Sequence, residues 1–426
     1  MTLCFVFACS FSALCEEVKT LRDPKGSTLL RKDRPMTSYF PPSDTEGGWR
    51  TCDPSDVGMS LQKLDETFEF IQGNTKNGGL AVVKDGYLVY EGYFGKGHRD
   101  WAPNSGSCGK SFTSIAMGIL LDEMPERFPD GLDQKVFTPD YLPEKAFPLR
   151  DERMADIRLG HLLTMAAGIR GNNPGCVNGK DVILDPVGPD GWQGMTDHYA
   201  LGLQESEMNG VPFTTRTLWC DPGGGYSYAT ASIHIVSVIV RHVTGLELQD
   251  YLEEKVAKHI GWERWNFAYR NAKEVDHTPG GGGIALRPTD MLRFLYMMLN
   301  NGRWGDLQIV SKAYVDHCAN PSFYNLHYPY SLQFNANGRG EHPGLPLDAY
   351  WKAGSGGHAL YVVPSHNIVV WKLGGRDDQY GEHNTGMGVL PEAAAAEMSR
   401  EDWKKVVEDG PALLKTLERV VGAVSK

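Results

Sequence analysis

Hydrophobic and polar positions divide the chain into strands near both ends and helices in the middle. Residues 79–95 contain two runs rich in β-branched and aromatic residues around Asp85-Gly86, which predicts a hairpin with an Asp-Gly turn. Two later runs, Ala359–Val363 and Ile368–Leu373, have the same character and also predict strands. Strands at both ends without regular βα alternation favour an antiparallel sheet over a doubly wound parallel one.

Apolar residues at helical spacing fill most of the chain between these strands. They predict helices over Asp156–Gly168, Ala229–Gly245 and Pro288–Asn301, and an amphipathic helix over Ala412–Val424. Another apolar helical face begins directly after Ser107. We therefore expect an α+β fold, in which an antiparallel sheet is flanked by helices and carries an inserted, mainly helical lobe.

The same pattern predicts the domain organisation. Residues 16–50 are polar with Pro and Gly and predict an extended arm. Residues 51–106 and 320–426 are expected to form the sheet lobe, and residues 107–319 the mainly helical lobe. Within it, residues 169–225 form a long stretch rich in Gly, Pro and aromatic residues. Loops of this length in a compact protein are usually functional, so we expect this one to lie at a substrate site.

Composition narrows the classes of function. The 426-residue chain has 41% hydrophobic residues and mixed charges, as globular proteins have. Its formal net charge of −11 and its lack of basic clusters argue against binding to nucleic acid or to anionic membranes. No apolar stretch reaches the length of about eighteen residues that predicts a transmembrane segment. C-x-x-C and H-E-x-x-H motifs are absent, so we expect no metal and no cofactor.

The N-terminus predicts export. An apolar run ends in Ala13-Leu14-Cys15, which is similar to a signal-peptide cleavage site, although the usual Lys or Arg before the run is missing. We expect residues 1–15 to be a signal peptide and the protein to be secreted or periplasmic, with a cytoplasmic protein as the alternative. After export, Cys176 and Cys220 could form a disulfide.

Ser107 and Lys110 are the first candidates for chemistry. Residues three apart on a helix are neighbours, so the lysine can take the proton of the serine hydroxyl once burial lowers its pKa. Ser60 and Lys63 have the same spacing, but Ser60 precedes an amphipathic pattern and is better explained as a helix N-cap. Cys108, next to the serine, is interpreted as a buried small residue rather than a second nucleophile.

The S-x-x-K element and several later segments, in family order, resemble the serine β-lactamase and penicillin-binding-protein family. The resemblance is to its class C branch, which also contains family VIII carboxylesterases and 6-aminohexanoate-dimer hydrolase, and it covers roughly residues 50–390. In the stretch DPGGGYSYATASIHIVSVIVRHVTG, the family's spacing selects Tyr228 over Tyr226 as the tyrosine of its Y-x-N element. Thr230 then occupies the asparagine position, which is a departure from the family.

The stretch WKAGSGG resembles the family's K-T-G strand, with Lys352 and Gly354 in the motif and Ser355 after it. Its register is open by a few residues. The resemblance implies that the backbone N–H groups of Ser107 and Ser355 are the two donors to an oxyanion. It also implies that Lys352 places positive charge near an acidic substrate group or near the oxygen of Tyr228.

The resemblance implies a hydrolase of small esters or amides. Ser107 would form an acyl-enzyme, Lys110 would act as its base and Tyr228 would relay a proton to the leaving group. Thr230 and the short turn after Gly354 favour the carboxylesterase branch. One alternative is a β-lactamase or D,D-peptidase that acts on lactams or cell-wall peptides. Another is a non-catalytic penicillin-binding-like sensor, but the three key residues are intact.

Two aromatic residues of the long loop are candidates for the substrate-side wall. Trp192 and Tyr199 stand among turn residues, and small-molecule pockets usually combine apolar rings with a few polar groups. The alternative is that these rings only pin the loop to the core. The expected partner is therefore a small-molecule ester or amide, and the oligomeric state is left open.

Overall fold

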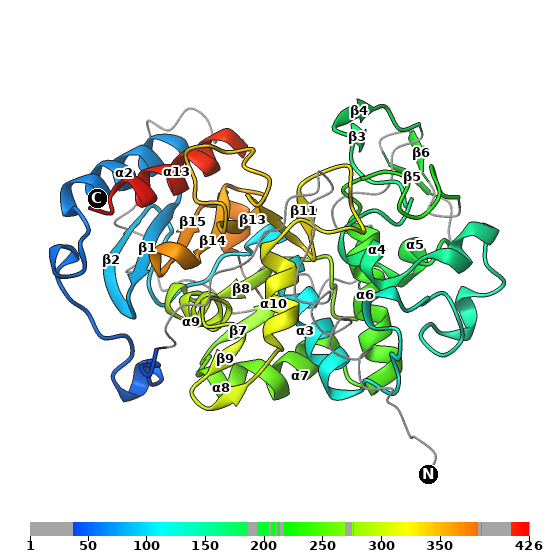
Figure 1. Ribbon diagram of the computed structural model, residues 1–426, viewed down its shortest axis with the longest axis horizontal. Coiled ribbons are helices and arrows are strands. Elements are labelled where there is room, and N and C mark those ends of the chain that lie inside the picture. The colour runs from blue at the N-terminus through cyan, green and yellow to red at the C-terminus, as the bar shows by residue number, and fades with distance from the viewer. Residues whose placement is uncertain are drawn as a thin grey trace, which may run out of the picture.

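The computed structural model describes residues 37–185, 194–203, 206–208, 211–213, 217–268, 275, 277–381, 385 and 410–425. The predicted signal peptide and most of the predicted N-terminal arm lie outside the described residues. Within the described part, the main feature is a seven-stranded antiparallel sheet in the order β11-β12-β13-β14-β15-β1-β2 (Figure 1). The strands are β1 (Gly78–Lys84), β2 (Tyr87–Phe94), β11 (Tyr330–Ser331), β12 (Phe334–Ala336), β13 (Tyr350–Gly354), β14 (His358–Val363) and β15 (Ile368–Leu373).

The sheet joins the two ends of the chain, as the hydrophobic pattern predicts. Strand β1 pairs antiparallel with β15, so that Val82 lies opposite Val370. The first hairpin turns at Asp85 and Gly86, whose φ values of 52° and 81° lie in the left-handed region. Two successive positive φ angles are what a tight hairpin turn requires, and Asp-Gly supplies them with little strain. The α+β expectation is therefore confirmed.

Helices cover both faces of the sheet. α2 (Leu61–Asn74) and α13 (Gly410–Gly422) pack together on one face, and α9 (Pro288–Leu299) packs on the other against β15, β14 and β1 (Figure 1). Alternation along β1 follows this arrangement, because Leu80 and Val82 join the core under α2 and α13, whereas Ala81 and Val83 join the larger core on the other side. Segment 107–319, predicted as mainly helical, thus also supplies a helix to the sheet.

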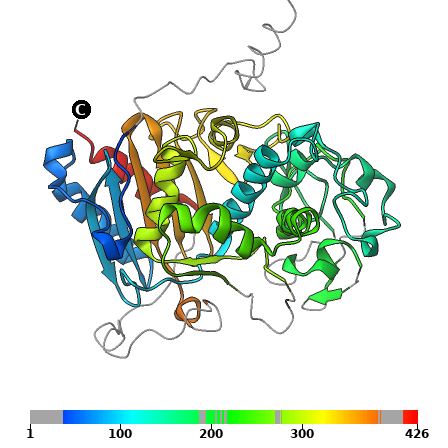
Figure 2. The same ribbon diagram turned by 90° about the horizontal axis from the view of Figure 1, so that it is seen from below.

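The helical side of the molecule is built around α3 (Gly109–Glu123) and α6 (Thr230–Thr244), which pack against each other (Figure 2). α6 begins and ends as predicted, with Ala229 as N-cap and Gly245 as a left-handed C-cap at φ 76°. The other helices of the described residues are α4 (Leu159–Leu163), α5 (Asp197–Ala200), α7 (Leu248–Leu252), α8 (Lys258–Ile260) and α10 (Lys312–Ala319).

The helix expected over Asp156–Gly168 is much shorter, and that prediction is wrong in extent. Only the five residues of α4 are α-helical, and Asp156 ends a separate 3-10 helix, Glu152–Asp156. Met165 and Gly168 have φ values of 58° and 77°, so the backbone turns into the left-handed region there and cannot continue the helix. The apolar run is buried as a loop, and its composition alone could not distinguish the two forms.

The long stretch 169–225 contains short elements of its own. They are the strands β3 (Gly175–Val177), β4 (Lys180–Val182), β5 (Ser206–Met208) and β6 (Val211–Phe213), together with α5. Cys176 and Cys220 are both free, so the disulfide considered above is not formed. The Cys176 thiol instead donates to the carbonyl oxygen of His327 at 3.3 Å. The remaining short strands are β7 (Trp265–Phe267), β8 (Ile284–Leu286), β9 (Arg303–Trp304) and β10 (Leu307–Gln308).

Candidate active site

Ser107 lies in a single 3-10 turn, Gly106–Cys108, which leads directly into α3. The helical spacing places Lys110 beside it, as predicted, and Lys110 Nζ donates to Ser107 Oγ at 3.1 Å. The same amine donates to the carbonyl oxygen of Gly281 at 2.7 Å. Lys110 is buried, and these contacts hold its amine against the serine hydroxyl.

The end of β13 lies directly against the serine turn. Gly106 has a φ of 56°, and a Cβ there would lie 2.6 Å from Ser355 Oγ and 2.8 Å from Ser355 N. A Cβ on Gly354 would lie 1.9 Å from the carbonyl oxygen of Ser105. Both positions therefore require glycine, because the two backbones approach too closely for any side chain. This contact brings Ser355 next to Ser107, the two predicted sources of oxyanion donors.

Gln379 connects the two segments on which these donors would lie. Its buried Nε2 donates to the carbonyl oxygen of Asn104 at 2.8 Å and to that of Ser355 at 3.0 Å. The backbone N–H of Asn104 in turn donates to the carbonyl oxygen of Gln379 at 2.8 Å. One side chain thus fixes the segment before the serine relative to the segment after β13. The sequence carried no motif around Gln379 that could have found it.

Replacing Gln379 by Leu should lower kcat by about 10–100-fold and change KM by less than about threefold. The variant removes the partner of the buried Asn104 carbonyl and of the partly buried Ser355 carbonyl, and leaving a buried carbonyl unpaired costs about 1–3 kcal/mol. Misplaced oxyanion donors would weaken binding of the transition state more than binding of the substrate. Steady-state kinetics with p-nitrophenyl acetate measures the split. Gln62→Leu is the control, since Gln62 is an exposed residue of α2, and it should change neither kcat nor KM. Unchanged kcat in a folded Gln379→Leu protein would contradict the positioning role.

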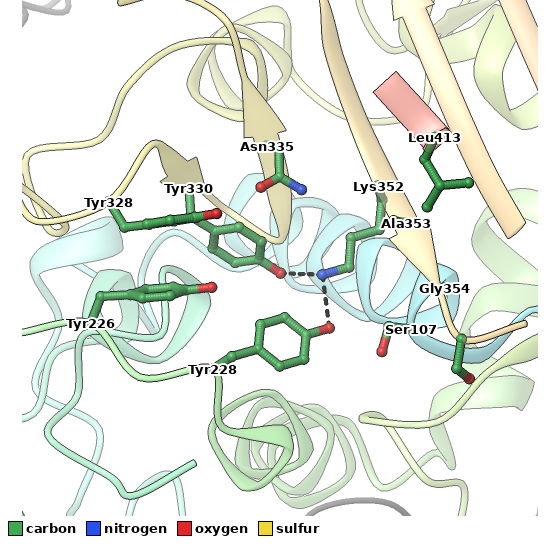
Figure 3. A pocket seen from close by; sticks show the side chains of 11 residues that line it. Ser107, Tyr226, Tyr228, Tyr328, Tyr330, Asn335, Lys352, Ala353, Gly354 and Leu413 are labelled. Atoms are coloured by element: carbon green, nitrogen blue, oxygen red, sulfur yellow. Dashed lines mark hydrogen bonds between the residues drawn. The ribbon is translucent and has the colours of Figure 1, made fainter. Parts of the chain in front are cut away.

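Lys352 holds the tyrosine that the resemblance selected. Lys352 Nζ donates to Tyr228 OH at 3.0 Å and also to Tyr330 OH, and Tyr330 OH donates to Gln333 Oε1 at 2.8 Å (Figure 3). Of the two positions that the resemblance allowed for its charge, the contacts favour the one beside the Tyr228 oxygen. Lys352 lines the pocket, but its side chain is almost completely buried.

The two buried lysines affect each other. Burial and the positive charge of Lys110 lower the pKa of Lys352 well below its ordinary value. The amines lie 5.4 Å and 4.7 Å from the centre of the Tyr228 ring, for Lys110 and Lys352 respectively. Burial and a nearby positive charge both favour the neutral form of Lys352. A neutral amine in such a pair can accept the proton of a hydroxyl group.

A pocket of about 320 Å³ opens over these groups. Tyrosines form one side of it, and the rings of Tyr226 and Tyr328 stack at 4.6 Å with an interplanar angle of 11°. Figure 3 shows that the side chains of Tyr228 and Tyr330 both point toward Lys352. The lining residues are Ser107, Tyr226, Tyr228, Tyr328, Tyr330, Asn335, Lys352, Ala353, Gly354, Ser355 and Leu413.

One of the two predicted wall residues, Tyr199, lies in α5 and is not among the residues that line this pocket. The other, Trp192, lies outside the described residues. The aromatic wall instead comes from Tyr226, Tyr328 and Tyr330. The last two follow no periodic pattern, because they stand in a loop and in a two-residue strand. Sequence reasoning had no signal with which to place them.

Thr230 occupies the position of the family's asparagine, so this position has no amide group. It is buried at the first turn of α6, where a Cβ on Gly281 would lie 2.5 Å from its Cγ2. It does not line the pocket, whereas the amide of Asn335 from β12 does. Asn335 is therefore a pocket amide that the sequence did not predict.

Cys108 lies next to Ser107 and is completely buried. Burial raises the pKa of the Cys108 thiol to about 12, so this cysteine stays protonated and is not a nucleophile.

Among the described residues, no group of three or more His, Cys, Asp or Glu side chains could hold a metal ion. In that same part of the chain, no single helix has the length and apolar character to cross a membrane. The bent pair Thr230–Thr244 and Leu248–Ile260 meets those criteria by length and composition alone.

Comparison with known proteins identifies the family to which this chain belongs. The family model described as Beta-lactamase matches residues 62–386. No curated protein gave a significant match.

Solved structures share the fold at low sequence identity. A family VIII carboxylesterase is 15% identical with a TM-score of 0.56, over 88% of this chain and 98% of the other. A penicillin-binding-protein homologue from Caulobacter crescentus is 12% identical with a TM-score of 0.56, over 86% of this chain and 99% of the other. A protein from Bacillus anthracis assigned as a 6-aminohexanoate-dimer hydrolase is 18% identical with a TM-score of 0.54, over 76% of this chain and 81% of the other. Because the family model spans about three quarters of its length, this chain belongs to the Beta-lactamase family.

Proposed function

We propose that the protein is a serine hydrolase that cleaves small esters or amides through an acyl-enzyme on Ser107. The observation that carries the proposal is the meeting of two hydrogen-bonded pairs in one pocket. Lys110 contacts Ser107 at 3.1 Å, and Lys352 contacts Tyr228 at 3.0 Å. A nucleophile beside a base, and a phenol held by a second amine, are the parts that acyl transfer requires.

The reaction would proceed in two steps. Ser107 Oγ attacks the carbonyl carbon while Lys110 Nζ accepts its proton, and the backbone N–H groups of Ser107 and Ser355 stabilise the oxyanion. Collapse of the tetrahedral intermediate breaks the bond to the leaving group, which receives a proton from Tyr228 OH. A water molecule then attacks the acyl carbon and gives its proton to the Tyr228 oxygen. The bond between the acyl carbon and Ser107 Oγ breaks, Lys110 Nζ returns its proton to Ser107 Oγ, and the acid is released.

The contacts of Lys352 favour esters as substrates. Its buried amine already donates hydrogen bonds to two phenols, so it offers little exposed positive charge to the carboxylate of a lactam or peptide. No Arg is among the residues that line the described pocket. A substrate carboxylate left without a partner in a pocket is discriminated against, since its desolvation is not compensated.

The test is a panel of substrates given to the purified enzyme. We expect kcat/KM for p-nitrophenyl acetate or butyrate to exceed that for a chromogenic cephalosporin and for a D-Ala-D-Ala peptide by about 10²-fold or more. A higher kcat/KM for the cephalosporin or the peptide would identify a β-lactamase or a D,D-peptidase instead. No turnover of any of them would count against the enzymatic proposal itself.

A further inference from the structure

A second compartment of about 340 Å³ adjoins the catalytic pocket. Pro329, His342, Trp351 and Leu414 line this second compartment and are not part of the catalytic pocket's lining. We propose that it binds an uncharged alkyl or aromatic group of the ester substrate, which rests on the proposed function because the same substrate would be acylated on Ser107. The substrate would then be an elongated, apolar ester.

The two spaces are continuous. Tyr328, Asn335, Ala353 and Leu413 line both of them. Neighbouring residues of β13 point to opposite faces of the sheet, so this strand can border both spaces. Lys352 faces the catalytic side, whereas Trp351 and Ala353 pack with the core under α13. The small side chain of Ala353 thus lies where a substrate would pass from one space to the other.

The lining determines which chemical group fits. Trp351, Leu413, Leu414 and Pro329 are apolar, and none of the residues around this compartment is Asp, Glu, Lys or Arg. The ring of His342 lies edge-on to Trp351, with centroids 5.5 Å apart and an interplanar angle of 72°, so the two rings form an aromatic corner of the compartment. A charged group would lose its hydration here without gaining a partner, whereas a hydrocarbon group gains by burial.

Asn335 and Tyr328 are the polar residues that line both spaces. The Asn335 amide can donate to the ester oxygen atoms of a substrate that spans both compartments. Apolar walls with a few orienting polar groups are typical of small-molecule sites.

Binding to a protein that cannot turn over the ester tests the inference. In a Ser107→Ala background, ligand-observed NMR would give dissociation constants for ethyl acetate, ethyl hexanoate and hexyl acetate. The two longer esters are isomers that carry the same alkyl length on the acyl side or on the alcohol side. We expect at least one of them to bind about tenfold or more tightly than ethyl acetate. The isomer that binds tighter identifies the part of the substrate in the second compartment.

Adding Leu414→Arg to the Ser107→Ala protein should abolish the tighter binding of the long ester, because the substitution places a charge in the apolar compartment. Leu61→Arg is the matched control, since Leu61 is 48% exposed on α2 and lines neither compartment, and it should leave the tighter binding intact. The inference is overturned if neither long ester binds more tightly than ethyl acetate, or if Leu414→Arg leaves the tighter binding unchanged. Because binding is measured without turnover, this result is independent of whether the enzyme prefers esters in the substrate panel.

Discussion

Ser107→Ala should lower kcat for p-nitrophenyl esters by about 10⁵–10⁶-fold while the protein remains folded. Ser107 Oγ is the atom that Lys110 contacts at 3.1 Å, and removal of a covalent nucleophile abolishes the acyl-enzyme route altogether. The measurement is steady-state turnover, together with mass spectrometry of the protein after mixing with ester. The acyl adduct should be present on the wild-type protein and absent from the variant.

Ser60→Ala is the control for this prediction. Ser60 belongs to the second S-x-x-K sequence, and it caps α2 by accepting a hydrogen bond from the backbone N–H of Lys63 at 3.4 Å. Its loss should reduce the free energy of unfolding by at most about 1 kcal/mol and leave kcat unchanged. If Ser60→Ala abolished turnover and Ser107→Ala retained it, the assignment of the nucleophile would be wrong.

Tyr228→Phe should lower kcat by about 10²–10⁴-fold, the range for loss of a general acid or base. Its hydroxyl is the group held by Lys352 at 3.0 Å, so the variant removes the proton carrier and keeps the ring. Steady-state kinetics with an ester and with the corresponding amide measures the loss. The loss should be larger for the amide, because an amine leaving group depends more on protonation.

Tyr226→Phe is the matched control, since Tyr226 lines the same pocket two residues earlier. Its ring stacks on Tyr328, and the phenyl ring can keep that stacking. Its kcat should stay within about threefold of the wild type. Equal losses in the two variants, or a larger loss for Tyr226→Phe, would rule out Tyr228 as the relay.

The parts of this protein that the sequence predicted are those controlled by neighbouring residues. The Asp85-Gly86 turn, the limits of α6 and the contact between Ser107 and Lys110 all depend on residues within one turn or one helix. The failure at Asp156–Gly168 has the opposite cause, because tertiary packing buries that apolar run with Met165 in a left-handed conformation. Local hydrophobicity cannot reveal such a change of backbone.

The rest of the candidate site depends on contacts between distant residues. Lys352 and Tyr228 stand 124 positions apart, and only the family resemblance suggested that they meet. Tyr330, Asn335 and Gln379 lie in short strands or a single 3-10 turn, which have no periodicity to recognise. Their roles follow from the way β11 and β12 continue the sheet next to β13.

The contact between β13 and the turn that carries Ser107 has a consequence for the synthesis of the protein. The ribosome releases Ser107 and α3 long before β13, whose Lys352 carbonyl lies 244 positions along the chain from its partner Cys108. During that interval the serine lacks Ser355, Gln379 and the strand that positions them, so a nascent chain should be unable to acylate itself. Contacts of such sequence separation also slow folding, because a long loop must close first. Reactivity toward an ester would therefore report the completion of folding, and labelling with an active-site acylating probe could follow refolding in real time.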